Sequence, residues 1–397
     1  MISSRIASFH NYQSVANDTM RQQVKVAHNQ EQLATGKRVN TAADDPVASI
    51  SIQNFHQQQV ELKQYQDTIN LARNRLTREE TAVNEIEQIA DEAKRRVMLM
   101  INGSLSADDR EAHRQDLHSN FEALLEVANI RDESGNYLFS GTLVSNRPFF
   151  VDRDNQVTYT GDSSQRYAIV APSVKVQTSD AGDRVFMEVE NPYGDYSPSY
   201  DLKMGSTVQL ASALNSNGAD NASYQVRFVQ GATGLNYELS QDGKVVNTAA
   251  YNAKTGIDWN GMALRFEGDI KDGDTIALKR QETVNIFDSF KRGLKLANAP
   301  VSDASATAEL NKVAEEFSAS FKHFNRVRSE LGTRLKTLDR QDSMHQDFNL
   351  ELEKARGTLE DLDYSSAVID LNENMMALKA SQQAFQKTKQ LSLFNYI

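Results

Sequence analysis

Residues 62–100 read LKQYQDTINLARNRLTREETAVNEIEQIADEAKRRVMLM, and their apolar side chains recur every seven positions. One series consists of Leu62, Ile69, Leu76, Val83, Ala90 and Val97. A second series consists of Tyr65, Ala72, Ile86, Ala93 and Met100, with Glu79 as its polar member. Together the two series fill both apolar positions of a heptad repeat, the pattern of helices that pack side by side. We therefore predict a helix of about 58 Å that packs along another helix.

A matching pattern lies near the other end of the chain. Its first series consists of Leu310, Phe317, Phe324, Leu331, Leu338, His345, Leu352 and Leu359. Its second series consists of Val313, Val327, Phe348, Ala355 and Leu362, and is interrupted by Ser320, Arg334 and Gln341. We expect both series to be packed within the chain, with residues 46–142 and 283–355 forming one helical bundle domain. The predicted fold class is mainly α with an all-β insertion, in which N- and C-terminal segments form an antiparallel coiled-coil-like bundle.

The segment between the two heptad patterns has another character. Short runs rich in β-branched and aromatic residues recur at 157–160, 167–170, 174–176, 185–189, 224–228, 237–239, 244–246, 263–266 and 275–278. Asp242-Gly243 is a typical hairpin turn between two of these runs. We predict that residues 143–282 form a β-rich inserted domain, which the stretches 192–198 and 215–221 could each divide into two subdomains.

Both ends of the chain carry apolar stripes. The C-terminal stripe consists of Tyr364, Val368, Leu371, Met375, Leu378 and Phe385, and the chain closes on Leu391, Leu393, Phe394, Tyr396 and Ile397. The N-terminal stripe consists of Ile6, Phe9, Met20, Val24 and Ala27. Chain ends are usually polar and frayed. We therefore expect residues 1–45 and 356–397 to form a terminal helical segment that self-associates, with these side chains as the assembly interface.

A turn motif, TGKRVNTAADDP, occupies residues 35–46. Asp44 or Asp45 can cap the free N–H groups of a helix, and Pro46 suits its first turn. The motif therefore predicts the start of the long bundle helix. Arg38, Asn40, Asp44 and Asp45 either complete a local turn network or contact a neighbouring subunit, and both interpretations stay open at this stage.

The composition excludes several classes of function. The chain has 397 residues, a net charge of −11 and no cysteine. An acidic chain is poorly suited to nucleic acid or to an anionic membrane surface, and disulfides are impossible. The N-terminus lacks the apolar region of a cleaved signal peptide, and no apolar run is long enough to insert into a membrane.

Residues that could carry chemistry are few. The seven histidines fall in predicted helical segments, and no His-Glu-x-x-His or phosphate-binding glycine motif occurs. Residues 231–234 and 152–155 are better explained as turns than as a phosphate or calcium loop. We expect His345, on a heptad position, to be packed. The sequence therefore predicts no catalytic, cofactor-binding or metal-binding residues, and a protein that is not an enzyme.

Three motifs in order resemble the bacterial flagellin and hook-associated proteins. They are TGKRVNTAADDP at 35–46, NYLFSGT at 136–142, and ALKASQQAF at 377–385 together with LSLFNYI at 391–397. The resemblance covers the helical frame, residues 1–142 and 283–397. Within this family, the ending and the stretch GDRVF at 182–186 look like those of the junction proteins between hook and filament, since filament flagellins usually end in a basic residue.

The resemblance implies a structural component of the bacterial flagellum that joins the hook, through the first hook-associated protein, to the flagellin filament. It also implies export through the flagellar type III apparatus without a cleaved signal, assisted by a cytosolic chaperone, and an extracellular location on the flagellum. A filament flagellin is the alternative within the family. A secreted adhesin is the alternative of another class, with Trp259 and scattered tyrosines as its weak support.

Overall fold

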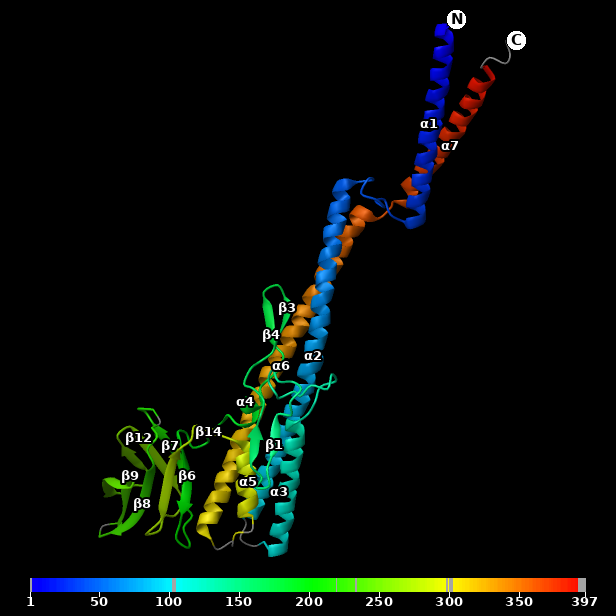
Figure 1. Ribbon diagram of the computed structural model, residues 1–397. Coiled ribbons are helices and arrows are strands. Elements are labelled where there is room, and N and C mark those ends of the chain that lie inside the picture. The colour runs from blue at the N-terminus through cyan, green and yellow to red at the C-terminus, as the bar shows by residue number, and fades with distance from the viewer. Residues whose placement is uncertain are drawn as a thin grey trace. The chain divides into compact units, whose positions relative to one another are not determined.

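The computed structural model describes residues 2–101, 105–218, 220–232, 234–297, 299 and 303–391 (Figure 1). It confirms a mainly α fold with a β-rich middle region. Contacts divide the chain into two compact units, one made of Met1–Asp67 with Gln341–Ile397 and the other of Thr68–Arg340. Helices α2 (Pro46–Met100) and α6 (Ala304–Glu360) contribute to both units. The domain boundaries predicted from the sequence, at 45/46 and 355/356, lie where the apolar pattern breaks, and they stay a prediction.

The larger unit is built on the heptad positions of α2 and α6. The first series of α6, from Leu310 to Leu338, is at most 2% exposed, and the first series of α2, from Ile69 to Val97, is equally buried. Helices α3 (Ala107–Ala128) and α5 (Ile286–Leu296) add Leu117, Phe121 and Phe290 to the same core. Four helices therefore enclose the predicted apolar series, which confirms intramolecular packing over this part of the pattern.

Two of the polar interruptions, Glu79 and Arg334, meet through a third residue, Asp180. Asp180 is fully buried, and its backbone N–H donates to Glu79 Oε1 (2.9 Å). The Arg334 guanidinium donates to both carboxylate oxygens of Asp180, at 2.7 and 3.2 Å. Arg184 adds a further bond to Asp180 (2.8 Å) and also reaches Glu330 (2.6 Å). The interruptions are thus two ends of one buried ionic network that links α2, α6 and the loop before α4.

The first part of the β region shares the helical core. It consists of the hairpins β1 (Phe149–Val151) with β2 (Val157–Tyr159) and β3 (Tyr167–Ala171) with β4 (Val174–Gln177). Phe149, Val170 and Val176 pack into the same cluster as the helices. This part of the inserted region therefore has no apolar core of its own.

The predicted strand at 185–189 is wrong. Residues Gly182–Phe186 form a short helix, α4, and only Val189–Glu190 is a strand, β5. Val185 and Phe186 are both fully buried in the helical core, and Phe186 packs edge-on against Phe139 (5.2 Å between ring centroids). Tertiary packing therefore overrides the β propensity of this run.

The NYLFSGT segment and α4 interlock. Gly182 N–H donates to the carbonyl of Phe139 (2.9 Å), and a Cβ at Gly182 would lie only 2.8 Å from that oxygen. Gly141 has a φ of 69° and lies against Asp162. The Thr142 hydroxyl and N–H bind Asp162, which lowers the pKa of Asp162 to about 2. The segments NYLFSGT at 136–142 and GDRVF at 182–186 thus have structural roles in this unit.

The second part of the β region has a core of its own. Its strands are β6 (Tyr196–Asp201), β7 (Gln209–Asn215), β8 (Tyr224–Gly231), β9 (Gly234–Gln241), β10 (Lys244–Ala250), β11 (Ile257–Trp259), β12 (Met262–Glu267) and β13 (Thr275–Arg280). Strand β14 (Thr283–Val284) follows them and pairs with β5. A five-stranded sheet has the order β10-β9-β8-β13-β6, and a three-stranded sheet the order β11-β12-β7. The core includes Tyr196, Val226, Phe228, Leu264 and Ile276. The change from one core to the other falls at the 192–198 stretch.

Candidate assembly interface

Helices α1 (Ile2–Thr35) and α7 (Tyr364–Leu391) pack along each other within the smaller unit (Figure 1). On α7, Leu371, Leu378 and Phe385 of the predicted stripe are half-buried, and Asn374 and Ser381 complete a series in three-and-four steps. Half-buried positions of α1 follow the same steps at Val15, Thr19, Gln22, Val26, Asn29 and Leu33. The amides of Asn29 and Asn374 lie 3.1 Å apart. The two ends of the chain therefore form a pair that covers one side of each helix.

Apolar side chains remain exposed around this pair. Val368 and Met375 of α7 are 45% and 37% exposed, and Met20 and Val24 of α1 are 64% and 67% exposed. Ile369 and Met376 are also exposed and lie beside Val368 and Met375. The exposed stripe on α7 is therefore two residues wide, because Val368 is followed by Ile369 and Met375 by Met376. Exposed apolar patches of this kind mark surfaces that bind a partner.

Several predicted interface residues lie outside the described part of the structure. Ile6 and Phe9 belong to α1, but their side chains are outside the described set. The same holds for the side chain of Leu391 at the end of α7, and Leu393, Phe394 and Ile397 lie beyond the described residues.

The turns at the base of the two helices pair with each other. Arg38 N–H donates to the Glu360 carbonyl (2.7 Å), and Leu362 N–H donates to the Gly36 carbonyl (3.0 Å). Lys37 and Asp361 form the antiparallel bridge between these two bonds. Gly36 has a φ of 70°, and a Cβ there would lie 2.8 Å from the hydroxyl oxygen of Tyr364. A glycine is therefore required both by the backbone conformation and by the close approach of α7.

The predicted helix start is confirmed, because α2 begins at Pro46. Asp45 Oδ1 accepts from Ala48 N–H (3.0 Å), and this bond together with Arg38 (3.2 Å) lowers the pKa of Asp45. Asp44 accepts from the backbone of Thr41 (2.8 Å) and Asn40 (3.0 Å), which lowers the pKa of Asp44.

Arg38 extends this network to the other end of the chain. Its guanidinium donates to the carbonyl of Leu359 at 2.8 Å, next to the backbone bond that Arg38 makes with Glu360. The motif is therefore a local network that also ties the turn before α2 to the end of α6.

The heptad reasoning also missed part of the exposed apolar surface. Val47 and Ile50 on α2, and Met344 and Leu350 on α6, are at least half exposed. Phe348, predicted to be packed, is 44% exposed, since in this unit each long helix is covered on one side and open on the other. His345 is packed as expected, stacked on Tyr65 with the ring centroids 5.6 Å apart. On α7, a signal was available for the second exposed row, because Ile369 and Met376 are seven apart beside the predicted stripe.

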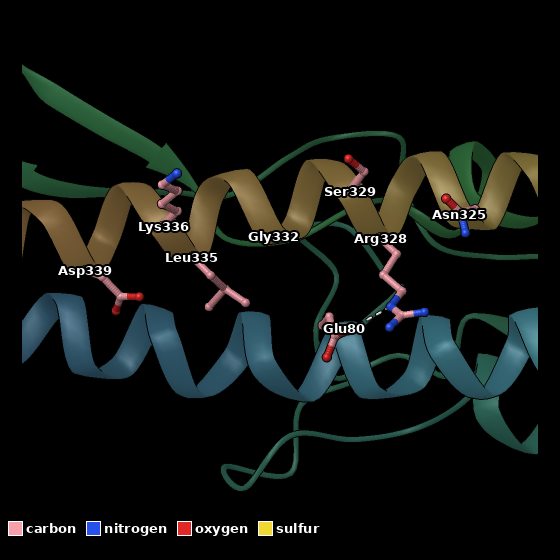
Figure 2. A pocket seen from close by; sticks show the side chains of 8 residues that line it. All are labelled: Glu80, Asn325, Arg328, Ser329, Gly332, Leu335, Lys336 and Asp339. Carbon is pink, nitrogen blue, oxygen red and sulfur yellow. Dashed lines mark hydrogen bonds and ion pairs between the residues drawn. The ribbon is translucent and has the colours of Figure 1, made fainter.

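The larger unit carries a groove between α2 and α6 (Figure 2). An ion pair between Glu80 and Arg328 (2.9 Å) closes one part of it, and a Cβ at Gly332 would meet nothing within 4 Å. The lining side chains are charged or polar apart from Leu335. Among the described residues, no group of three or more histidine, aspartate or glutamate side chains could hold a metal ion. None of the described helices has the length and apolarity needed to cross a bilayer.

Comparison with known proteins gives consistent results. The bacterial flagellin N-terminal helical region matches residues 2–143. Flagellar hook-associated protein 3 of Escherichia coli K12 is 23% identical over 369 residues, covering 92% of this chain and 90% of that protein. The protein of the same name from Salmonella typhimurium is 24% identical over 364 residues, covering 92% and 90%. The crystal structure of the flagellar junction protein FlgL from Legionella pneumophila is 25% identical, with a TM-score of 0.66 over 79% of this chain and 100% of that one.

Proposed function

We propose how this chain assembles, given that it is a flagellar hook-associated protein of the flagellin family. As such a protein it is a structural component of the flagellum and not an enzyme. It forms a short zone of self-associated subunits between the first hook-associated protein and the flagellin filament. The terminal helical segment, residues 1–45 and 356–397, makes the contacts between subunits, while residues 46–142 with 283–355 and the inserted residues 143–282 form the rest of each subunit.

The observation that carries this proposal is the exposed apolar surface of the paired helices α1 and α7. Val368, Met375, Ile369 and Met376 lie on one helix with no covering element among the described residues of this unit. Burial of a side chain of this size contributes about 1.5–3 kcal/mol. Several such side chains per subunit supply a contact energy that grows with every neighbour. Leu371, Leu378 and Phe385 are half-buried already and complete their burial in the assembly.

The proposal extends to export. The chain leaves the cell unfolded through the flagellar type III apparatus without a cleaved signal, and its final location is extracellular, on the flagellum. Before export, a chaperone holds the C-terminal stripe in an apolar groove, as amphipathic helices are commonly held. The exposed stripe on α7 is the feature that suits such a groove.

The test replaces two exposed residues of the stripe, Val368→Ser with Met375→Ser, in a strain whose own junction protein has been deleted. Because both side chains are exposed, the variant keeps the melting temperature of the wild type. Filaments should fail to attach to hooks, so flagellin should appear in the medium. The measurements are electron microscopy of cell-bound filaments and the amount of flagellin in the supernatant.

The matched control is Val245→Ser with Val246→Ser on β10, which also exposes two apolar side chains. This control should attach filaments normally. Wild-type attachment in the α7 variant, with normal amounts of secreted protein, would refute the interface. If the purified wild-type protein instead grew long filaments alone, it would be a filament flagellin.

A further inference from the structure

Strand β6 lies at one edge of the five-stranded sheet, with β13 on one side of it. On its other side, side chains of α6 take the place of a strand. Ser305 Oγ accepts from Leu202 N–H (2.8 Å), and Glu309 Oε1 accepts from Tyr200 N–H (3.1 Å). Lys312 Nζ donates to the Pro198 carbonyl (2.6 Å). Groups of the alternate residues Pro198, Tyr200 and Leu202 along this edge are therefore bonded to one helix.

The spacing of these α6 residues fits the strand. Positions 305, 309 and 312 are four and three residues apart, so they share one face of the helix. They span about 10 Å along the helix axis, whereas the strand from residue 198 to 202 spans about 13 Å. The short serine and the long lysine and glutamate side chains make up the difference. Pro198 also fits this edge, because it has no N–H that would need a partner.

The seam between α6 and the β region is mostly polar. From α6, the β core gains Ala308 and, at its margin, Ala304, which are both small. Lys312 is buried and Glu309 is half-buried, and the charges of Glu316 and Arg292 act on both. The remaining large side chains of the β core come from its own strands and from the loops between them. Separation from α6 would thus expose little apolar surface, and water could bond the freed strand groups.

A narrow neck joins the same β region to the rest of the unit. Strand β5 pairs with β14 over two residues each, and Asn191 N–H donates to the Glu282 carbonyl (3.0 Å). A pocket lies between this neck and α6, lined by Asn191, Pro192, Glu315, Ser318 and Lys322 among others. Val189 and Val284 of the neck are buried, and Glu190 pairs with Arg326 of α6 (2.9 Å), so the neck is held on its inner face while the pocket leaves open space beside it. That space gives room for a change of angle.

We propose that Ser305, Glu309 and Lys312 form a polar latch that fixes the orientation of the β module, residues 193–281, on α6. When the latch opens, the module turns about the β5–β14 neck as an intact body, since its apolar core does not depend on the helix. The latch therefore sets the angle at which this module is presented, independently of the terminal helices.

The test uses the absence of cysteine from the sequence. Cysteines at Lys244 on β10 and Arg95 on α2, both exposed, carry spin labels for a distance measurement in the full chain. The latch variant combines Ser305→Ala, Glu309→Ala and Lys312→Ala, and alanine keeps the helix favourable. The distance distribution should be narrow in the wild type and broad or shifted in the latch variant. The control Lys336→Ala, on the same helix but in the groove of Figure 2, should leave it narrow.

Amide exchange separates release of the module from its unfolding. In the latch variant, the amides of Tyr200 and Leu202 should exchange faster, while those of Val226 and Leu239 in β8 and β9 stay protected. An unchanged, narrow distance distribution would overturn the proposal. So would a joint loss of protection across β6, β8 and β9, because the α6 side chains would then maintain the fold of the module and not its orientation.

Discussion

The helical core and the terminal pair are built on the same seven-residue spacing but differ in burial. In the core, Phe317, Phe324 and Leu331 are fully buried, whereas Leu378 and Phe385 in the terminal pair stay half-buried and Val368 is exposed. The core positions are enclosed by α3, α5 and the first two β hairpins, while α1 and α7 have one another. A heptad pattern therefore gives the faces that pack, and the number of neighbours decides how completely they are buried.

The largest expected effect comes from a cavity in the helical core. Phe317→Ala should reduce the free energy of unfolding by about 3–5 kcal/mol, because the site is fully enclosed. The matched variant Phe385→Ala in the terminal pair should leave the main unfolding transition of the monomer unchanged. Urea titration followed by circular dichroism measures both. Equal losses in the two variants would mean that the regions do not differ as described.

The ionic network should give the next largest effect. Arg334→Met leaves the buried Asp180 with Arg184 and Gln177, so we expect a loss of about 3 kcal/mol, at the low end for a broken buried pair. Arg95→Met removes an exposed pair with Asp91 and should change stability by less than about 0.5 kcal/mol. If Arg334→Met changed the free energy of unfolding only slightly, water would be replacing the guanidinium group at Asp180.

A smaller, local effect is expected in the terminal unit. Asp45→Ala removes the cap of α2 and the bond from Arg38. Hydrogen exchange should become faster at the amides of Ala48 and Ser49, while the melting temperature of the core stays the same. Asp67→Ala, which removes an exposed pair with Lys63, is the control. If the cap variant also lowered the core melting temperature, the two regions would be more strongly coupled than their different burial suggests.

The smallest effect concerns Glu79. Burial raises the pKa of Glu79 well above its usual range, and its Oε2 is buried without a hydrogen-bond partner. We therefore expect Glu79→Gln to be tolerated at neutral pH. Because the pKa is raised in the folded state, the stability that Glu79 contributes is present below its unfolded pKa and is lost as the pH rises through the folded value. The melting temperature of the wild type should therefore fall as the pH rises across this range, while that of Glu79→Gln should change less.

Much of the fold follows from the sequence. Both long helices, the start of α2 at Pro46, and strands such as β8, β9 and β13 lie where their patterns predict. Local signals suffice for these elements, because a heptad series or a hairpin turn is complete within one segment.

What could not be predicted depends on partners far apart in sequence. Glu79 and Arg334 are recognisable as polar interruptions, but Asp180, which joins them, has no local signal. The helix α4 forms because Phe186 fits the helical core, against its strand propensity. Strands β6 and β7 were missed since Pro198 and several serines and asparagines weaken their apolar alternation. In the candidate interface, spacing identified Val368 and Met375 but could not say which side of α1 would face α7.

The paired turns at the base of α1 and α7 have a consequence for the order of folding. Arg38 and Leu359, which are bonded there, lie 321 residues apart in the chain. Closing such a long loop is entropically costly and slow compared with forming a helix or a hairpin. A chain that emerges from its N-terminus first holds residues 36–38 without partners until almost all of it has followed. The contacts between the paired turns are therefore among the last to form, and their formation joins the two ends of the molecule.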